Sequence, residues 1–364
     1  MGLYLLFLIG CLSGIVLFRR KLIPQSTEVN PGNVKLSVII PARNEAKNLS
    51  NILDSLRAQT VKPYEIIVVD DCSEDRTKEI AASYGVTVIE NPALPLGWTG
   101  KTWAVWNGFL NSSGDTIVFL DADIRLSARA LESLLKARAK AGGVISVVPF
   151  HHTEKFYERL ALIPNILGVF AFTSLFEHNN PRKGLYGSCI VTSRTDYETI
   201  HGHSSIRAEL LDDLNLGARY REAGIPVTNF IGRGLVSFRM YPQGLKSELQ
   251  GFGKGAVLST AKLSIWTIML VALWFLGLIA SMGAVFLWNT PWAYPLIFGY
   301  MLYVFHIYYL VRDVGYFGKI MPFLHIFSTL FFLVVLLYSA YQVLFLGHVS
   351  WKGRAIEVGG QRDK

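Results

Sequence analysis

Two kinds of hydrophobic pattern alternate along the middle of the chain. Short apolar runs, such as Leu36–Ile40 and Ile66–Val69, have the length and composition of buried strands. Between them, from Leu49 to Leu56, apolar residues recur at three and four positions and fall on one face of a helix. Buried strands followed by amphipathic helices predict an α/β sheet.

The same plan repeats further along the chain. The second apolar run ends at Asp70-Asp71 and precedes a helix predicted near Thr77–Tyr84. Thr116–Leu120 is a further buried strand, with a helix expected from about Ala128 onward. This order, with acidic residues at strand ends, predicts a nucleotide-binding α/β domain. No Gly-x-Gly-x-x-Gly follows the first strand, which argues against a dinucleotide site.

Uncharged apolar segments occupy both ends of the sequence. Met1–Phe18 carries no charge and runs into Arg19-Arg20-Lys21, with no basic segment before it and no small-residue cleavage site after it. Residues 1–21 are therefore predicted to be a membrane anchor and not a removed signal. Positive charge on its C-terminal side places the following domain in the cytoplasm.

The C-terminal part, residues 263–347, reads as a set of membrane helices. Turn signals divide it into spans near Ile265–Leu287, Trp292–Val311 and Phe323–Leu346. One span before the domain and three after it would leave the basic tail, residues 348–364, outside, against the positive-inside rule. One segment is therefore expected to be re-entrant or interfacial.

Composition supports a multi-pass protein of the cell membrane. The 364 residues are 51% hydrophobic, and their mean hydropathy of +0.34 is too high for a purely soluble protein. The formal charge of +8 comes from scattered Lys and Arg without a nucleic-acid-binding signature, so we attribute it to an anionic membrane surface and expect no nucleic-acid partner. Three cysteines without metal spacing suit a reducing compartment.

Asp121 and Asp123 follow the buried run Thr116–Leu120. Alternate strand residues point the same way, so this spacing predicts two carboxylates facing one ligand at the C-terminal edge of the sheet. Mg²⁺ and Mn²⁺ prefer oxygen ligands and usually complete their shell with substrate phosphates. The pattern predicts a metal-dependent sugar-nucleotide enzyme held on a membrane, although the two aspartates would also serve as a helix cap.

Four ordered motifs resemble the signatures of family 2 glycosyltransferases. They are Val38–Glu45, Val68–Asp75, Phe119–Asp123 and Leu211–Arg219. The resemblance implies a GT-A, Rossmann-like nucleotide-sugar domain over residues 33–255 and an inverting transfer. Within this family, the chain is similar to the 4,4'-diaponeurosporenoate glycosyltransferases of bacterial carotenoid synthesis. This narrower resemblance rests on the segment Pro95–Ala104, the anchor and the three C-terminal spans.

The resemblance implies a UDP-sugar site that holds Mg²⁺ or Mn²⁺. Asp123 would ligate the metal that bridges the diphosphate. Asp121 would stand beside that metal and contact the ribose or the sugar, and Lys101 would meet a phosphate. The uridine half would be held after the first two strands by Pro41, Ala42, Arg43, Glu45, Asp70 and Asp71.

The last motif implies the catalytic carboxylate. Asp213 matches the base of inverting members, and Asp212 stands where they more often have Glu; the alternative is that both cap a helix. The Arg-Trp pair of processive members is missing after Gln250, so we expect one sugar per acceptor. Lys254 would replace that Arg as a phosphate contact, although the two residues are not equivalent at bidentate sites.

Other features are open between a functional and a structural interpretation. Trp98, Trp103 and Trp106 would form a sugar or lipid platform or belong to the core. His201 and His203 have metal-like spacing but no evident acidic partner, so ligation is the less favoured interpretation. The uncharged stretch of residues 160–176 would be an interfacial helix for a lipid tail or a buried core helix.

We expect the enzyme to move one hexose, glucose, from UDP-glucose to the carboxylate of a C30 apocarotenoid. A carboxylate is already ionised at neutral pH, so Asp213 would orient it, whereas a hydroxyl lipid such as a hopanoid, diacylglycerol, polyprenyl or sphingoid lipid would need the base directly. The competing class is a non-catalytic membrane transporter or scaffold. The acidic residues expected from the motifs are all present, which argues against that class.

Overall fold

The computed structural model describes residues 1–25, 34–254, 256–351 and 354–357. The chain divides into two compact units. Unit 1 consists of residues 1–21, 151–180 and 240–344, and unit 2 consists of residues 22–150, 181–239 and 345–364. The segment 151–180, which the sequence pattern places inside the α/β domain, thus clusters with the apolar helices.

A seven-stranded sheet forms the centre of unit 2, in the order β3-β2-β1-β4-β8-β6-β9. Strands β3, β2, β1 and β4 are parallel, whereas β8 is antiparallel to both of its neighbours, β4 and β6. The predicted α/β fold is confirmed, and the carboxyl ends of β1, β2 and β4 meet at one edge. The strands are β1 Leu36–Ala42, β2 Glu65–Asp70, β3 Thr87–Glu90, β4 Thr116–Leu120, β6 Val144–Val148, β8 Cys189–Ser193 and β9 Val227–Ile231.

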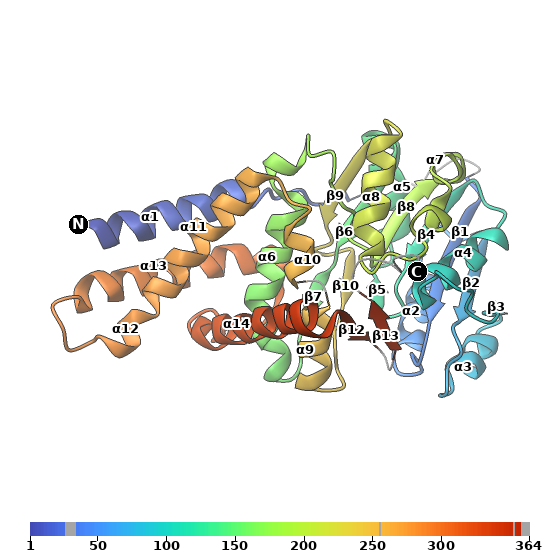
Figure 1. Ribbon diagram of the computed structural model, residues 1–364. Coiled ribbons are helices and arrows are strands. Elements are labelled where there is room, and N and C mark those ends of the chain that lie inside the picture. The colour runs from blue at the N-terminus through green and yellow to red at the C-terminus, as the bar shows by residue number, and fades with distance from the viewer. Residues whose placement is uncertain (26–33, 255, 352–353, 358–364) are drawn as a thin grey trace. The chain divides into compact units, whose positions relative to one another are not determined.

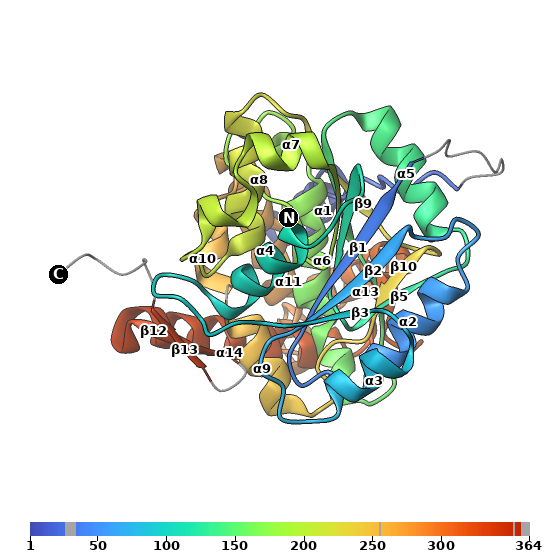
Figure 2. The ribbon, with the colours of Figure 1, turned by 90° about the vertical axis from the view of Figure 1, so that its right-hand side faces the viewer.

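Helices cover both faces of this sheet (Figure 1). In Figure 2, α4, α7 and α8 lie on one side, and α2, α3 and α5 lie on the other. On the first side Phe109, Tyr197 and Tyr220 belong to the same buried cluster as Ile39 and Phe119 of the sheet. The helices are α2 Leu49–Arg57, α3 Thr77–Ser83, α4 Gly100–Leu110, α5 Ala130–Ala141, α7 Arg194–Thr199 and α8 Asp212–Glu222, and the short strands β5 Ile124–Leu126 and β10 Val236–Phe238 pair antiparallel.

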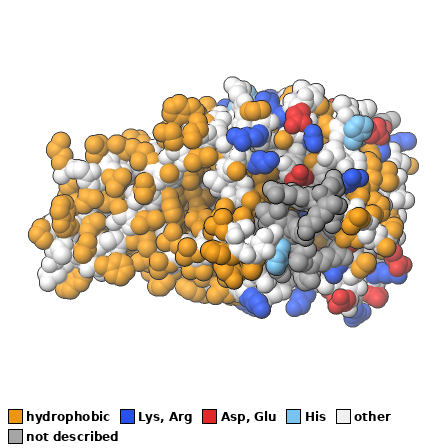
Figure 3. Space-filling model, in the orientation of Figure 1, with side chains coloured by type: hydrophobic (Ala, Val, Ile, Leu, Met, Phe, Trp, Pro, Cys, Tyr) orange, Lys and Arg blue, Asp and Glu red, His pale blue; other side chains and the backbone are white. Residues whose placement is uncertain are grey.

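Unit 1 consists mainly of apolar helices. Three stretches, Ile265–Phe286, Ala293–Val314 and His325–Leu346, are long and apolar enough to cross a membrane, which confirms the predicted C-terminal helices. On the face shown in Figure 3, hydrophobic side chains cover these helices. The elements are α1 Gly2–Leu17, β7 Phe150–His152, η1 Tyr157–Ala161, α6 Leu162–Thr173, α9 Leu245–Gly253, α10 Ala256–Thr260, α11 Ile265–Ser281, α12 Gly283–Phe286, α13 Ala293–Val314, β11 Gly315–Tyr316 and α14 His325–Tyr341.

The N-terminal helix α1 packs directly against α11 and α13. A Cβ at Gly10 would overlap the hydroxyl of Tyr303 on α13, so the close approach of the two helices requires a small residue there. Beyond the end of α1, Arg20 forms a 2.7 Å ion pair with the fully buried Asp313. These contacts integrate the apolar N-terminus into the helical unit.

Helix α6 is a core helix of unit 1. Most of its side chains are buried, and Phe170 packs edge to face on Trp274 with ring centroids 5.3 Å apart. The backbone N–H of Ile163 donates to Ser328 of α14 at 2.8 Å. Pro164 lies in the first turn, where no intrahelical N–H bond is lost. The buried-core interpretation of this stretch therefore describes it better than an exposed interfacial helix.

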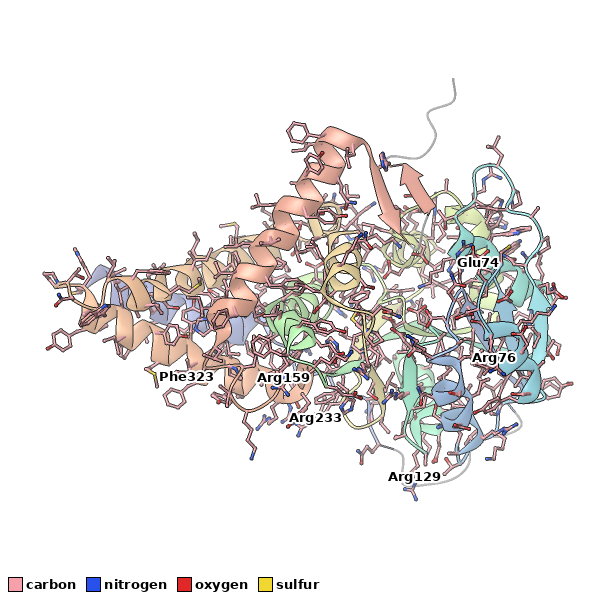
Figure 4. The ribbon with its side chains drawn as sticks, turned by 90° about the horizontal axis from the view of Figure 1, so that it is seen from below. Glu74, Arg76, Arg129, Arg159, Arg233 and Phe323 are labelled. Atoms are coloured by element: carbon pink, nitrogen blue, oxygen red, sulfur yellow. The ribbon has the colours of Figure 1, made fainter. Side chains whose placement is uncertain are left out.

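The last apolar helix runs in a different direction from the others. Figure 4 shows α14 crossing the direction of α11 and α13 steeply, with Phe323 just before its start. After α13 the chain folds back along that helix, because Tyr300 donates to the carbonyl of Phe323 at 2.6 Å and its ring stacks on His325. Helix α14 therefore begins beside the interior of α13.

The far end of α14 lies beside the short helices that precede α11. The hydroxyl of Ser339 accepts from the N–H of Val257 on α10 at 3.3 Å. A Cβ at Gly253 of α9 would approach the ring of Tyr338 to 2.6 Å. Because α10 leads into α11, α14 ends near the start of α11. Length and hydropathy alone do not reveal this direction.

We therefore expect α14 not to cross the bilayer, so that the C-terminal tail, residues 348–364, lies on the cytoplasmic side. With α1, α11 and α13 as the crossing helices, this arrangement obeys the positive-inside rule for the basic tail. Green fluorescent protein fused after residue 364 should fluoresce in a bacterial host, and alkaline phosphatase fused there should be inactive. The same reporters placed after Trp288 should give the opposite pattern. Active phosphatase after residue 364 would show that α14 spans the membrane.

Candidate active site

Lys101 lies among three aspartates at the edge of the sheet. It stands in the first turn of α4, and its Nζ is 2.9 Å from Oδ1 of Asp121. Burial alone would lower the pKa of Lys101, but the charges of Asp121, Asp212 and Asp213 outweigh that effect and hold the pKa above its ordinary value. Since 36% of its side chain is still exposed, Lys101 is a charged group within reach of a ligand.

A small pocket opens at this cluster. Lys101, Asp121 and Asp212 line it together with Pro41 from β1 and Gly187, which precedes β8. The structure thus brings together residues that the sequence motifs named separately. The remaining lining residues are Val105, Phe119, Leu120, Ile190 and His203.

Asp121 and Asp123 lie in a turn and not on a strand. Strand β4 ends at Leu120, β5 begins at Ile124, and the N–H of Ile124 donates to the carbonyl of Asp121 at 3.2 Å. The alternation of side chains along a strand does not extend into a turn. The expectation that strand geometry orients the two carboxylates alike is therefore wrong, and the turn between the two strands places them instead.

The acidic turn has the chemistry of a hard-metal site. Its side chains offer only carboxylate oxygens, which suit Mg²⁺ or Mn²⁺. Across residues 1–25, 34–254, 256–351 and 354–357, no three His, Cys, Asp or Glu side chains group closely enough to hold a metal by themselves. A cation held by Asp123 and Asp121 would thus need further oxygens, such as those of a bound diphosphate.

The carboxylate of Asp213 is held by backbone donors. Its Oδ2 accepts from the N–H of Gly187 at 3.0 Å, and its Oδ1 accepts from the N–H of Leu214 at 2.9 Å. A Cβ at Gly187 would lie 3.1 Å from Oδ2, so glycine permits this approach. The first turn of α8 also favours a negative charge. The alternative that Asp212 and Asp213 cap this helix is wrong, because the N-cap residue of α8 is Leu211, without a side-chain cap, and both aspartates lie inside the first turn.

The loops after β1 and β2 are joined to each other. The N–H of Asn44 donates to Ser73 at 3.0 Å, and the N–H of Glu74 donates back to Oδ1 of Asn44 at 2.8 Å. The N–H of Glu45 donates to Thr77 at 2.8 Å. The two segments expected to hold a uridine therefore form one connected surface.

Arg43, Asp70 and Asp71 lie at the base of these loops. Asp70 and Asp71 are both 7% exposed. The Arg43 guanidinium donates to the carbonyl of Asp71 at 3.1 Å and lies 3.8 Å from its carboxylate. Oδ2 of Asp70 accepts from the N–H of Ser73 at 3.3 Å. Ala42 pairs with Asp70 in the sheet register, which fixes the relative height of the two strand ends.

Two asparagines that the sequence analysis missed connect α4 with the end of β2. Nδ2 of Asn107 donates to Oδ1 of Asn91 at 2.7 Å, and Nδ2 of Asn91 donates to Oδ1 of Asp71 at 3.0 Å. All three side chains are buried. The available signal in the sequence was Asn107, a polar residue on the apolar face of the α4 segment. A buried amide requires hydrogen-bond partners, so such a residue indicates a polar contact with another element. The chain links the helix of Lys101 to Asp71.

The candidate tryptophans and histidines have different environments in the structure. Trp106 packs against the core cluster, which favours the core interpretation for it, whereas Trp98 and Trp103 are half-buried and pack edge to face with centroids 4.9 Å apart. His201 is exposed, while Nδ1 of His203 lies 2.6 Å from the hydroxyl of Tyr197. This hydrogen bond does not favour a metal site shared by the two histidines.

Lys254 belongs to unit 1, where it follows α9 as its C-cap. Its expected contact with a phosphate stays a prediction.

Comparison with known proteins agrees with the geometry of the site. Residues 37–200 match Glycosyl transferase family 2. The 4,4'-diaponeurosporenoate glycosyltransferase of Staphylococcus aureus strain USA300 is 30% identical over 358 residues, which cover 96% of this chain and 95% of that relative. The chain belongs to glycosyl transferase family 2. It is therefore a glycosyltransferase, as the four motifs predicted.

A solved structure shares the fold of this family 2 enzyme. A mannosyltransferase from Pyrobaculum calidifontis in complex with GDP-Man and Mn²⁺ has a TM-score of 0.58 and 19% sequence identity, covering 94% of this chain and 95% of its own. This similarity confirms the predicted GT-A type of fold.

Replacing Asn91 should weaken donor binding. Asn91→Ala leaves the buried Asp71 carboxylate without the amide donor and separates it from Asn107, so we expect the KM for the nucleotide-sugar donor to rise about tenfold. Steady-state kinetics with varied donor would measure this. Asn111→Ala, at the exposed end of α4, is the matched control and should leave KM unchanged. If Asn91→Ala, like Asn111→Ala, kept the wild-type KM for the donor, the asparagine chain would have no role in donor binding.

Proposed function

We propose that this family 2 enzyme transfers one glucose from UDP-glucose to the carboxylate of a C30 apocarotenoid. The observation that carries the proposal is the 30% identity, over 96% of the chain, to a 4,4'-diaponeurosporenoate glycosyltransferase. A lipid acceptor also agrees with the apolar helices of unit 1. We further propose that unit 2 faces the cytoplasm, where nucleotide sugars are made.

The donor would bind along the edge of the sheet. Pro41, Ala42, Arg43 and Glu45 would surround the uracil and ribose together with Asp70 and Asp71, because the two loops that carry them are hydrogen-bonded to each other. Lys101, which pairs with Asp121 at 2.9 Å, would turn toward the diphosphate when the donor enters. The mannosyltransferase from Pyrobaculum calidifontis, solved with GDP-Man and Mn²⁺, supports a nucleotide diphosphate sugar as the donor class.

A divalent cation at Asp123, with Asp121 beside it, would neutralise charge that develops on the departing diphosphate. Lys101 would add a fixed positive charge on the same leaving group. Both groups would assist cleavage of the bond between C1 of the sugar and the diphosphate oxygen. The bond that forms joins C1 to a carboxylate oxygen of the acceptor, so UDP leaves and the product is a glycosyl ester with inverted configuration.

Asp213 would act on the acceptor side, with Asp212 beside it. Its carboxylate is fixed by the N–H groups of Gly187 and Leu214. An acceptor carboxylate carries no proton at neutral pH, so Asp213 would orient it. A hydroxyl acceptor would instead give its proton to Asp213 during attack. Transfer to a lipid hydroxyl is therefore the second candidate, and the fixed carboxylate is the observation that favours it.

The expected product carries a single sugar. The segment after Gln250 lacks the Arg-Trp pair of processive members. Lys254 would supply a positive charge near that position and contact a phosphate. A point-charge ammonium does not reproduce the planar, bidentate contact of an arginine.

Transfer of radiolabelled glucose from UDP-glucose, with Mn²⁺, to lipid extracts by membranes that contain the enzyme tests the proposal. We expect metal-dependent label on a pigmented lipid, and we expect mild alkali to remove it because esters hydrolyse and ethers do not. Asp123→Ala should reduce incorporation at least a hundredfold, since it removes a metal ligand. Alkali-stable label would assign the acceptor to a hydroxyl lipid. No label from any UDP-sugar would contradict the proposed donor.

A further inference from the structure

A buried histidine and tyrosine form part of the pocket wall. His203 lies in the 3₁₀ helix η3, Gly202–Ile206, and Tyr197 lies on α7. Tyr197 is fully buried and His203 is 3% exposed, yet the histidine ring lines the pocket with Lys101 and Asp212. The ring also packs on Phe119 with centroids 5.6 Å apart. Packing against Phe119 explains an aromatic residue at this position, but it does not explain why that residue is a histidine.

The hydrogen bonds of Tyr197 determine which nitrogen of His203 carries the hydrogen. The tyrosine oxygen accepts from the backbone N–H of His203 at 3.0 Å, and it lies 2.6 Å from Nδ1 of the ring. If Nδ1 were the donor, the buried hydroxyl hydrogen would have no acceptor among the described residues. The hydroxyl therefore donates to Nδ1. In a neutral imidazole the other nitrogen, Nε2, then carries the hydrogen.

The ring is neutral at physiological pH. Burial lowers the pKa of His203 to about 4, a shift that Asp212 opposes and Lys101 assists. With Nδ1 engaged by Tyr197, Nε2–H is the uncharged donor that remains for the pocket. His203 lines the pocket together with a cation, Lys101, and with Asp212, whose carboxylate can only accept.

We propose that Nε2–H of His203 donates to a hydroxyl oxygen of the sugar in the nucleotide-sugar donor, which makes His203 a specificity-determining residue. A sugar hydroxyl can accept from Nε2–H and donate to a carboxylate such as Asp212 at the same time. A phosphate oxygen has no hydrogen to donate, and Asp212 would repel it. Lys101 provides the charge suited to the diphosphate, so the neutral donor suits the sugar. The inference rests on the proposed function.

Binding of UDP and UDP-glucose to the purified full-length enzyme, with Mn²⁺, separates this role from packing. His203→Phe keeps an aromatic ring against Phe119 but removes the donor. We expect the affinity for UDP to stay within twofold of the wild-type value and the affinity for UDP-glucose to fall about tenfold. Isothermal titration calorimetry in detergent would measure both. An equal fall for the two ligands, or no fall for either, would overturn the proposal.

Two further variants keep the test independent of folding defects. His203→Gln can return an N–H near the position of Nε2 and should restore a part of the preference for UDP-glucose over UDP. Tyr197→Phe removes the hydroxyl that selects the tautomer and should reduce the preference by about threefold, less than His203→Phe does. If His203→Gln bound UDP normally but restored none of the preference, the hydrogen-bond role would be refuted. If the wild-type enzyme bound neither ligand, the proposed donor would fail instead.

Discussion

The ion pair between Lys101 and Asp121 is the interaction on which the site depends. Asp212 and Asp213 act on the same lysine, so its positive charge stabilises carboxylates that would otherwise repel one another. In the complex that we propose, a divalent cation would bring a diphosphate with it, and Lys101 would then be free to contact a phosphate. The unliganded cluster therefore already contains the groups that we propose for donor binding.

The sheet topology explains why these groups meet. Strand β8 is antiparallel to β4, so the start of β8 lies beside the end of β4, and the N–H of Asp121 donates to the carbonyl of Ser188 at 3.0 Å. Gly187, one residue earlier, reaches Asp213 at the start of α8. The first turns of α4 and α8 thus face the same strand end. A mixed sheet thus brings together the residues that we propose for the leaving-group side and those that we propose for the acceptor side of the reaction.

Much of this architecture could be predicted from the sequence because it depends on local patterns. Apolar runs predicted β1, β2 and β4, and the motifs around them predicted the family. The turn at Asp121 was beyond that reasoning, since an Asp-x-Asp sequence fits a strand end and a turn equally well. The Asn107–Asn91–Asp71 chain and the Tyr197–His203 pair depend on side chains from separate elements. Hydropathy predicted the length of α14 but contains no information on its direction.

The charge on Lys101 can be tested directly by the affinity of the enzyme for UDP-glucose in the presence of Mn²⁺. Lys101→Met retains most of the side chain's apolar contacts and removes its charge. If Lys101 stabilises the carboxylates and then meets the diphosphate, the dissociation constant measured by calorimetry should rise at least tenfold, and added salt should weaken binding less than it does in the wild-type enzyme. An unchanged dissociation constant with an unchanged salt dependence would contradict this account of the site.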